Sequence, residues 1–179
     1  MTPPRSPDAL ASLASDSLTG RVALVTGGGS GIGRATAELL ARMGAKVAVV
    51  GRREDALAET VSRISAAGGT ATAYPCDIRE PENVDALLDA VLDAELTIDL
   101  LVNNAGGQFV GKAEDISYKG FRAVERLNLD ATWYVSTQVA KRSMLPHGFG
   151  KIASITMTMT PHRGIVGMSH SSAARAGVE

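Results

Sequence analysis

A glycine-rich segment near the N-terminus has the composition and spacing of a phosphate-binding turn. The segment TGGGSGIG (residues 26–33) follows a short apolar run, RVALVT (residues 21–26), and precedes a stretch of helical periodicity. Glycines let backbone N–H groups at a helix start approach a diphosphate, and the helix dipole favours the negative charge. The Ser30 hydroxyl adds a further donor. The segment therefore predicts a dinucleotide site, although any tight turn between a strand and a helix also favours glycine.

The end of the second apolar run, KVAVVG (residues 46–51), distinguishes between NAD and NADP if the dinucleotide is a nicotinamide nucleotide. NAD-binding proteins usually place a carboxylate here, which accepts a hydrogen bond from the ribose 2′-hydroxyl. This chain has Arg52 and Arg53 instead, and guanidinium groups suit a 2′-phosphate. We therefore predict NADP or NADPH in preference to NADH. The alternative is that both arginines only solvate a loop and pair with Glu54 or Asp55.

Apolar runs with strand character alternate with stretches of helical periodicity, and no internal repeat is found. The predicted strands lie in residues 21–26, 46–51, 70–77, 98–107 and 150–156, and the predicted helices in residues 33–45, 53–69, 80–95 and 117–145. Gly120 is a candidate interruption of the last helix. This alternation predicts βαβ units with a parallel sheet and helices on both faces, which is the doubly wound α/β class.

Composition narrows the class of protein further. The chain has 179 residues, 45% hydrophobic and 21% charged, with a formal net charge of −1. We expect one domain over residues 19–179, preceded by a flexible N-terminal tail over residues 1–18. The near-neutral charge argues against a nucleic-acid partner, and no apolar run approaches the roughly 18 residues of a membrane span. Cys76, the single cysteine, permits no internal disulfide and fits a reducing, cytoplasmic location. The three histidines lack metal-ligand spacing, so we predict no metal.

Two segments in the expected order carry a resemblance to a known family. T-G-x-x-x-G-I-G and, later in the chain, N-N-A-G (residues 103–106) together resemble the signatures of the short-chain dehydrogenase/reductase family, over residues 18–179. The resemblance implies a Rossmann-type fold, a small-molecule substrate and a homo-oligomer. It implies a cofactor bound by Gly27, Ser30, Gly31, Ile32, Gly33, Arg52, Arg53, Asp77, Ile78, Asn104, Ala105 and Gly106. Asp77 would meet the adenine amino group, or act only as a turn residue.

The family's catalytic residues are only partly present. Asn128 matches the family asparagine that anchors a water in a proton relay. For the family serine, the segment ITMTMT offers Thr156 or Thr158, of which we favour Thr158, or these are ordinary loop threonines. Ser171 and Arg175 stand where the family has tyrosine and lysine. A serine hydroxyl is a poor general acid at neutral pH, so ordinary carbonyl reduction is in doubt.

One branch of the family departs in a similar way. The segments NNAGGQFVGKAEDISYKGFRAV and HSSAARAGV resemble the trans-2-enoyl-CoA reductases, which use NADPH to reduce the C2–C3 double bond of an acyl-CoA. Their Tyr-x-x-x-Lys pair would begin at Glu179, so this chain departs from them too. An enolate oxygen needs a hydrogen-bond donor more than a strong acid, and Thr156, Thr158, Ser171 or His170 could supply one, although such a histidine is more often a surface or packing residue.

Alternatives to enoyl reduction remain. The chain could belong to a ketone or 3-oxoacyl reductase, or to an NADP-binding protein without activity. Family members commonly continue past the position of Glu179 with further strands. We therefore expect a C-terminally truncated Rossmann domain of five strands, from a parent that is peroxisomal if the source is eukaryotic. We expect this chain alone to bind NADPH weakly or not at all and to have little activity, and the full-length parent to be the reductase.

Overall fold

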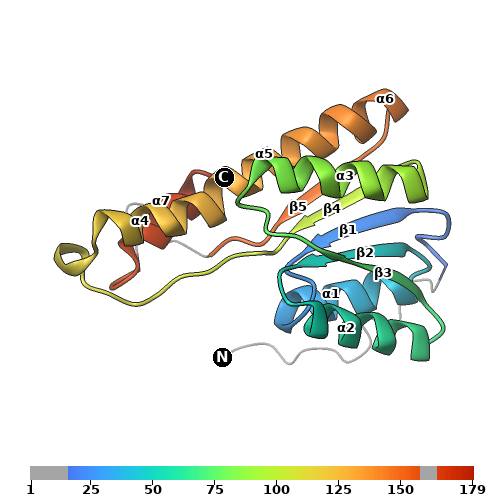
Figure 1. The fold of residues 1–179 in the computed structure, drawn as a ribbon, viewed down its shortest axis with the longest axis horizontal. Helices are drawn as coiled ribbons and strands as arrows, with labels where there is room; N and C mark the ends of the chain where they lie inside the picture. The colour runs from blue at the N-terminus through green and yellow to red at the C-terminus, as the bar shows by residue number, and fades with distance from the viewer. Residues whose placement is uncertain (1–15, 158–164) are drawn as a thin grey trace, which may run out of the picture.

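The chain forms one parallel sheet in the computed structural model, which describes residues 16–157 and 165–179. All neighbouring strands in this part of the chain pair in parallel, in the spatial order β3-β2-β1-β4-β5 (Figure 1). The strands are β1 (Val22–Thr26), β2 (Lys46–Gly51), β3 (Thr70–Pro75), β4 (Leu100–Asn103) and β5 (Lys151–Ser154). The predicted doubly wound α/β fold is confirmed.

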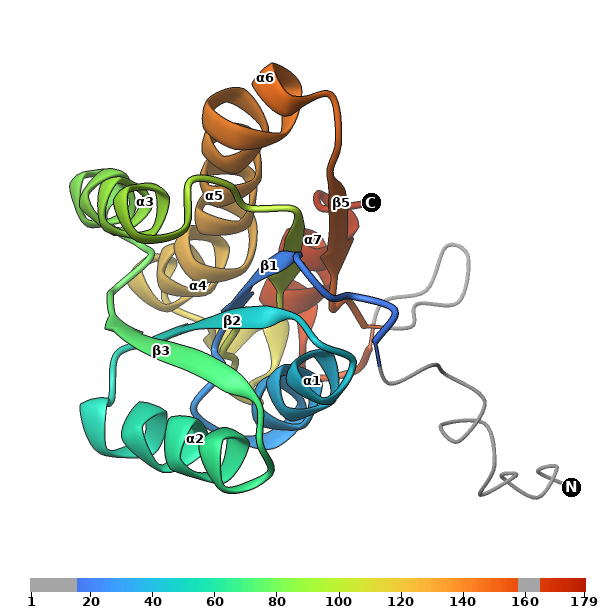
Figure 2. The ribbon, with the colours of Figure 1, turned by 90° about the vertical axis from the view of Figure 1, so that its right-hand side faces the viewer.

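Helices cover both faces of the sheet. Figure 2 shows α1 and α2 on one face and α3 and α5 on the other. The helices are α1 (Gly31–Arg42), α2 (Glu54–Ala66), α3 (Pro81–Glu95), α4 (Tyr118–Glu125), α5 (Ala131–Val139), α6 (Leu145–His147) and α7 (Ser169–Ala176), with a 3-10 turn, η2 (Ala113–Asp115). None of the helices in the described residues is long and apolar enough to cross a membrane.

Successive side chains of β1 are buried on opposite faces of the sheet, as expected for its central strand. All five of its residues are buried. Leu24 packs into the apolar cluster that includes α3 and α5, whereas Ala23 and Val25 pack into the cluster that includes α1 and α2. A strand buried on both faces reads as a continuous apolar run, which is the pattern seen in the sequence.

The strand order brings four turns to one edge of the sheet. From β1 the chain builds outward to β2 and β3, and then returns to add β4 on the other side of β1. In such sheets a crevice opens at the carboxyl ends of the strands where the order reverses. The turns after β1, β2, β3 and β4 therefore converge there.

The helical stretch from Tyr118 to His147 is not interrupted at Gly120. Gly120 lies in the first turn of α4, where its N–H donates to Oγ of the N-cap residue Ser117 at 3.1 Å. Two π-helical segments, η3 (Arg126–Asp130) and η4 (Ala140–Met144), join α4, α5 and α6 instead. The expected interruption at Gly120 is wrong, and the irregularity falls around Asn128, at a position where π-turns often mark functional sites.

Candidate functional site

A cleft of about 410 Å³ lies over the carboxyl ends of the strands at the point where their order reverses. Its lining contains all of the predicted cofactor residues except Gly33, namely Gly27, Ser30, Gly31, Ile32, Arg52, Arg53, Asp77, Ile78, Asn104, Ala105 and Gly106. The structure thus brings together segments that are far apart in the sequence. Because all four turns contribute to it, this cleft is the candidate functional site.

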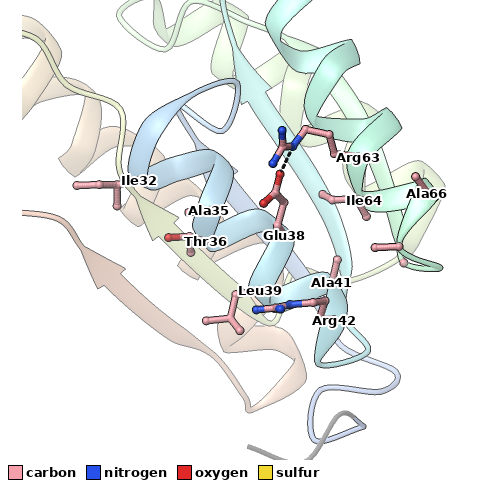
Figure 3. A pocket seen from close by; sticks show the side chains of 12 residues that line it. Ile32, Ala35, Thr36, Glu38, Leu39, Ala41, Arg42, Arg63, Ile64 and Ala66 are labelled. Atoms are coloured by element: carbon pink, nitrogen blue, oxygen red, sulfur yellow. Dashed lines mark hydrogen bonds and ion pairs between the residues drawn. The ribbon is translucent and has the colours of Figure 1, made fainter. Parts of the chain in front are cut away.

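A larger hollow of about 810 Å³ lies elsewhere, along α1 and the end of α2 (Figure 3). Its lining is mostly aliphatic, with the ion pair between Glu38 and Arg63 across it, at 2.5 Å from Nε to Oε1. It shares Ile32 with the cleft, but the turns after β2, β3 and β4 do not line it. Its size alone does not make it the site of chemistry.

Asn104 holds the glycine-rich turn from behind. Its Nδ2 donates to the carbonyl oxygens of Thr26 and Gly27, at 3.0 and 3.2 Å. In return, Oγ1 of Thr26 accepts hydrogen bonds from the backbone N–H groups of Asn104 and Ala105, both at 3.1 Å. The ends of β1 and β4 are therefore tied to each other, and the turn is held to both.

Gly33 serves this packing rather than the surface of the cleft. A Cβ at Gly33 would lie 2.3 Å from the carbonyl oxygen of Gly27 and 2.4 Å from Nδ2 of Asn104. Gly31 is different, because its φ is +52° and nothing lies within 4 Å of a Cβ built there. One glycine thus allows close approach within the protein, and the other leaves space on the open side of the turn.

The turn presents unoccupied donors at the start of α1. Within the described residues, none of the N–H groups from Gly29 to Ile32 donates to a protein acceptor. Ser30 is the N-cap residue of α1, but its side chain makes no capping hydrogen bond, so the hydroxyl stays available. Free N–H groups with the positive end of a helix dipole favour an anion. The donor set therefore fits a nucleotide diphosphate.

Arg34 and Thr60, which the sequence gave no reason to select, also bond carbonyl groups of the glycine-rich turn. Nη2 of Arg34 donates to the carbonyl oxygen of Gly29 at 2.7 Å. Oγ1 of Thr60, from α2, donates to the carbonyl oxygen of Gly28 at 3.1 Å. Arg34 reads in the sequence as an ordinary surface residue of a helix, and Thr60 lies 26 residues away from it, so no local signal identifies either contact.

Arg52 and Arg53 are exposed at the rim of the cleft. Neither makes an ion pair within the part of the chain that the structure describes. The pairing with Glu54 or Asp55 that the sequence left open is therefore not observed. Two unpaired guanidinium groups beside the end of β2 give this part of the cleft a positive charge, which suits a phosphate group.

Asp77 has the turn role that the sequence left open. Its Oδ1 accepts from the backbone N–H of Arg79 at 3.2 Å and from Nε of Arg79 at 2.8 Å. The bonds from the Arg79 side chain lower the pKa of Asp77, and the charge of Arg52 adds to this effect. A carboxylate that stays ionised can still accept a further hydrogen bond, so contact with an adenine amino group stays a prediction.

Asn128 and Arg175 both lie beside Gly106, which lines one end of the cleft. A Cβ at Gly106 would lie 2.2 Å from Nη2 of Arg175 and 2.7 Å from Oδ1 of Asn128. The fully buried Asn128 donates from Nδ2 to the carbonyl oxygens of Gly107 and Val124, at 2.8 and 2.9 Å, and accepts from the N–H of Gly107. The asparagine therefore fixes the loop after β4 against the helix.

Arg175 supplies a fixed positive charge at this end. Its Nη1 donates to the carbonyl oxygen of Ile155, just after β5, at 2.8 Å. Burial lowers the pKa of Arg175, yet a guanidinium group in a protein remains charged at neutral pH. It can attract negative charge and donate hydrogen bonds, but it cannot act as an acid.

The remaining catalytic candidates have different surroundings. Ser171 is buried one helical turn before Arg175, and its Oγ donates to Oε1 of Gln108 at 2.6 Å. Thr156 is exposed after β5, and Thr158 lies outside the described residues. His170 is fully buried, with its ring centroid 4.4 Å from that of Phe109, and neither ring nitrogen has a partner within the described residues. The structure therefore shows His170 packed against Phe109, and a role as a hydrogen-bond donor to substrate stays a prediction.

The sheet order, the cleft at the reversal of that order and the glycine turn at the start of α1 define a Rossmann-type α/β domain. The sequence model of the short chain dehydrogenase family matches residues 21–179. The chain therefore belongs to the short-chain dehydrogenase/reductase family.

Individual relatives carry several activities in their names. The chain is 32% identical to a probable 2,4-dienoyl-CoA reductase of Bacillus subtilis (strain 168), covering 88% of this chain and 62% of the relative. Among solved structures, it is 42% identical to the citronellol catabolism dehydrogenase AtuB of Pseudomonas aeruginosa PAO1, with a TM-score of 0.86 over 91% of this chain and 66% of that one. It is 36% identical to an actinorhodin polyketide ketoreductase with NADPH, with a TM-score of 0.84 over 88% and 60%. The chain spans 52% of the length of one curated relative, an uncharacterized oxidoreductase of Caenorhabditis elegans.

Replacing Gly33 with alanine is expected to lower the free energy of unfolding by roughly 1 to 3 kcal/mol, because the added methyl group meets a backbone carbonyl and a fixed amide. Urea denaturation measures the change. Gly51→Ala is the matched control, since a Cβ there meets Leu57 at an ordinary 3.4 Å. Equal stability of the two variants would contradict the prediction, because it would show that the turn shifts to accommodate the added methyl group at little cost.

The thiol of Cys76 is expected to react slowly with iodoacetamide. Burial, and then the charge of Asp77, raise the pKa of Cys76 to about 11, so the reactive thiolate is scarce at neutral pH. Alkylation followed by mass spectrometry should be roughly a hundredfold slower than for a free cysteine. The urea-unfolded protein serves as the control and should react at the ordinary rate. Equally fast labelling of the folded protein would contradict the burial.

Proposed function

We propose that this chain forms the nucleotide-binding part of an NADPH-dependent oxidoreductase that reduces the C2–C3 double bond of an enoyl-CoA. One observation carries the proposal: the charged guanidinium of Arg175 lies beside Gly106, which lines the cleft. A fixed cation favours chemistry that develops negative charge without needing a proton from the same group. The relatives named as 2,4-dienoyl-CoA reductases support a double bond conjugated to a thioester as the substrate.

The residues of the cleft fit the nucleotide. The free N–H groups from Gly29 to Ile32 would hold the diphosphate, and Arg52 and Arg53 would pair with the 2′-phosphate. When bound, NADPH supplies the hydride that C3 of the substrate accepts. The chain's own residues then have to orient the thioester and stabilise the electron pair that moves onto its oxygen.

Arg175 is the group best suited to that task. As C3 gains the hydride, the C2–C3 π electrons shift so that an enolate forms on the thioester oxygen, and a guanidinium stabilises this charge by attraction and hydrogen bonding. The proton that later reaches C2 comes from water. Asn128 keeps the loop at Gly107 in place, so that the wall of the site does not shift during the reaction.

Carbonyl reduction is the second candidate. The ketoreductase with NADPH and a ketoacyl reductase of Nostoc, 34% identical, support it. It needs a group that protonates the new alkoxide, and the Ser171 proton is already directed to Gln108 in this structure. An NADP-binding protein without activity is the third alternative. The homo-oligomer and the cellular compartment stay predictions.

The whole oxidoreductase of which this chain forms the nucleotide-binding part is expected to oxidise NADPH with crotonyl-CoA. It should be at least about tenfold less efficient with acetoacetyl-CoA, since only the first reaction proceeds without an acid. The absorbance of NADPH follows both reactions. Arg175→Met should abolish turnover, whereas Arg126→Met, an exposed arginine of the same chain, should not. Preference for acetoacetyl-CoA would select carbonyl reduction, and nucleotide binding without either activity would select the inactive alternative.

Replacing Arg52 with aspartate is expected to shift the ratio of kcat/KM for NADPH over NADH toward NADH by about tenfold, because a charged hydrogen bond to the 2′-phosphate becomes a repulsion. Lys119→Asp, at the start of α4 and outside the cleft, makes the same change in net charge and should leave the ratio unchanged. An Arg52 variant with the wild-type ratio would refute the assignment of NADPH.

A further inference from the structure

The direction of the peptide groups in the glycine-rich turn decides whether it attracts or repels an anion. In a trans peptide unit the carbonyl of one residue and the N–H of the next point in opposite directions. The backbone of a glycine-rich turn does not by itself fix the direction of its peptide groups, because glycine populates a wide range of φ and ψ. A contact that holds a carbonyl on one side therefore holds the following N–H on the other.

The carbonyls of the turn are all engaged within the protein. Those of Thr26 and Gly27 accept from Asn104, as described above. The carbonyl of Ser30 accepts from the backbone N–H of Arg34 at 3.1 Å, which is the first bond of α1. The two carbonyls between them belong to Gly28 and Gly29, and these have only side-chain donors to hold them.

The two donors form one connected unit. Oγ1 of Thr60 donates to the carbonyl of Gly28, and Nη2 of Arg34 donates to the carbonyl of Gly29. Nε of Arg34 also donates to Oγ1 of Thr60 at 3.1 Å, so the two side chains fix each other. Thr60 is fully buried, and its one hydroxyl proton is shared between the carbonyls of Gly28, at 3.1 Å, and Ala56, at 3.0 Å.

Glu59 completes the unit and limits its charge. Its carboxylate accepts two hydrogen bonds from Arg34, at 2.6 and 2.8 Å. Such a bidentate pair fixes the plane of the guanidinium. It also balances the positive charge of Arg34 with a negative one, so simple attraction of a phosphate by Arg34 is not the main effect of this residue.

We propose that Arg34 and Thr60 are positioning residues, which turn the N–H groups of Gly29 and Ser30 toward the diphosphate by holding the carbonyls of Gly28 and Gly29 away from it. The inference rests on the proposed function in one respect, namely that the cleft binds a dinucleotide. It assigns to α2 a part in phosphate binding that α2 performs without touching the phosphate.

Calorimetric titration of the purified protein with NADPH, NADH and ADP-ribose tests the proposal. Thr60→Val keeps the shape of the side chain but removes the hydroxyl, and Arg34→Met keeps an apolar stem but removes the guanidinium. Each should weaken all three ligands by about tenfold, because the donors to the shared diphosphate are no longer preoriented. The ratio of NADPH to NADH affinity should stay constant, unlike in an Arg52 variant.

Two controls separate positioning from general loss of packing. Thr60→Ser retains the hydroxyl and should bind within about twofold of the wild-type protein. Arg63→Met removes the ion pair with Glu38, which also joins α1 to α2 but touches no carbonyl of the turn. It should likewise bind normally, even where its melting temperature falls as far as that of Arg34→Met.

Wild-type affinity in Thr60→Val and Arg34→Met, or equal weakening in Arg63→Met, would overturn the inference. If the wild-type protein binds no nucleotide, the proposed function fails, and the amide NMR signals of Gly29 and Ser30 in the nucleotide-free protein decide the inference. These signals should move in Thr60→Val and Arg34→Met but not in Thr60→Ser or Arg63→Met. Signals that move equally in all four variants, or in none, would count against it.

Discussion

The structure depends on one constraint, which is that a glycine turn must present its N–H groups, and not its carbonyls, to the cleft. A bare turn contains as many acceptors as donors, and an anion is stabilised only if the acceptors point elsewhere. Here each carbonyl from Thr26 to Ser30 accepts a hydrogen bond from the protein.

This constraint links the site to the topology of the sheet. Asn104 can bond the end of β1 only because β4 is the direct neighbour of β1, with Val25 paired to Val102. Thr60 reaches the turn only because α2 packs on the same face of the sheet as α1. The order of the strands in the sheet therefore determines which side chains bond the carbonyls of the turn. Those bonds in turn leave the N–H groups of the turn facing the cleft.

Much of this could be predicted from the sequence, since the signals are local. The glycine spacing, the apolar runs and the arginines after β2 stand in continuous segments, which predict the strands, the glycine-rich turn and the arginines beside it. The cleft residues after β3 and β4 were expected only from the resemblance to the family. Contacts between distant segments could not be predicted: Arg34 and Thr60 are separated by 26 residues, and each is an unremarkable helix residue. Gly120 was judged from helix propensity alone, which the N-cap bond to Ser117 overrides.

Protein acceptors also hold the polar side chains beside Gly106. There the result is a fixed positive charge rather than a group that transfers a proton. Arg175 is held by the carbonyl of Ile155 and lies against Gly106, where a side chain of any size would displace it. The hydroxyl of Ser171 donates to Oε1 of Gln108 at 2.6 Å, and Sδ of Met157 lies 3.7 Å from it. Both groups are thus fixed by protein acceptors, and what remains for a substrate is a stationary positive charge. A site of this kind stabilises an anion that forms beside it and leaves protonation to water, which is the requirement of a conjugated double bond more than of a ketone.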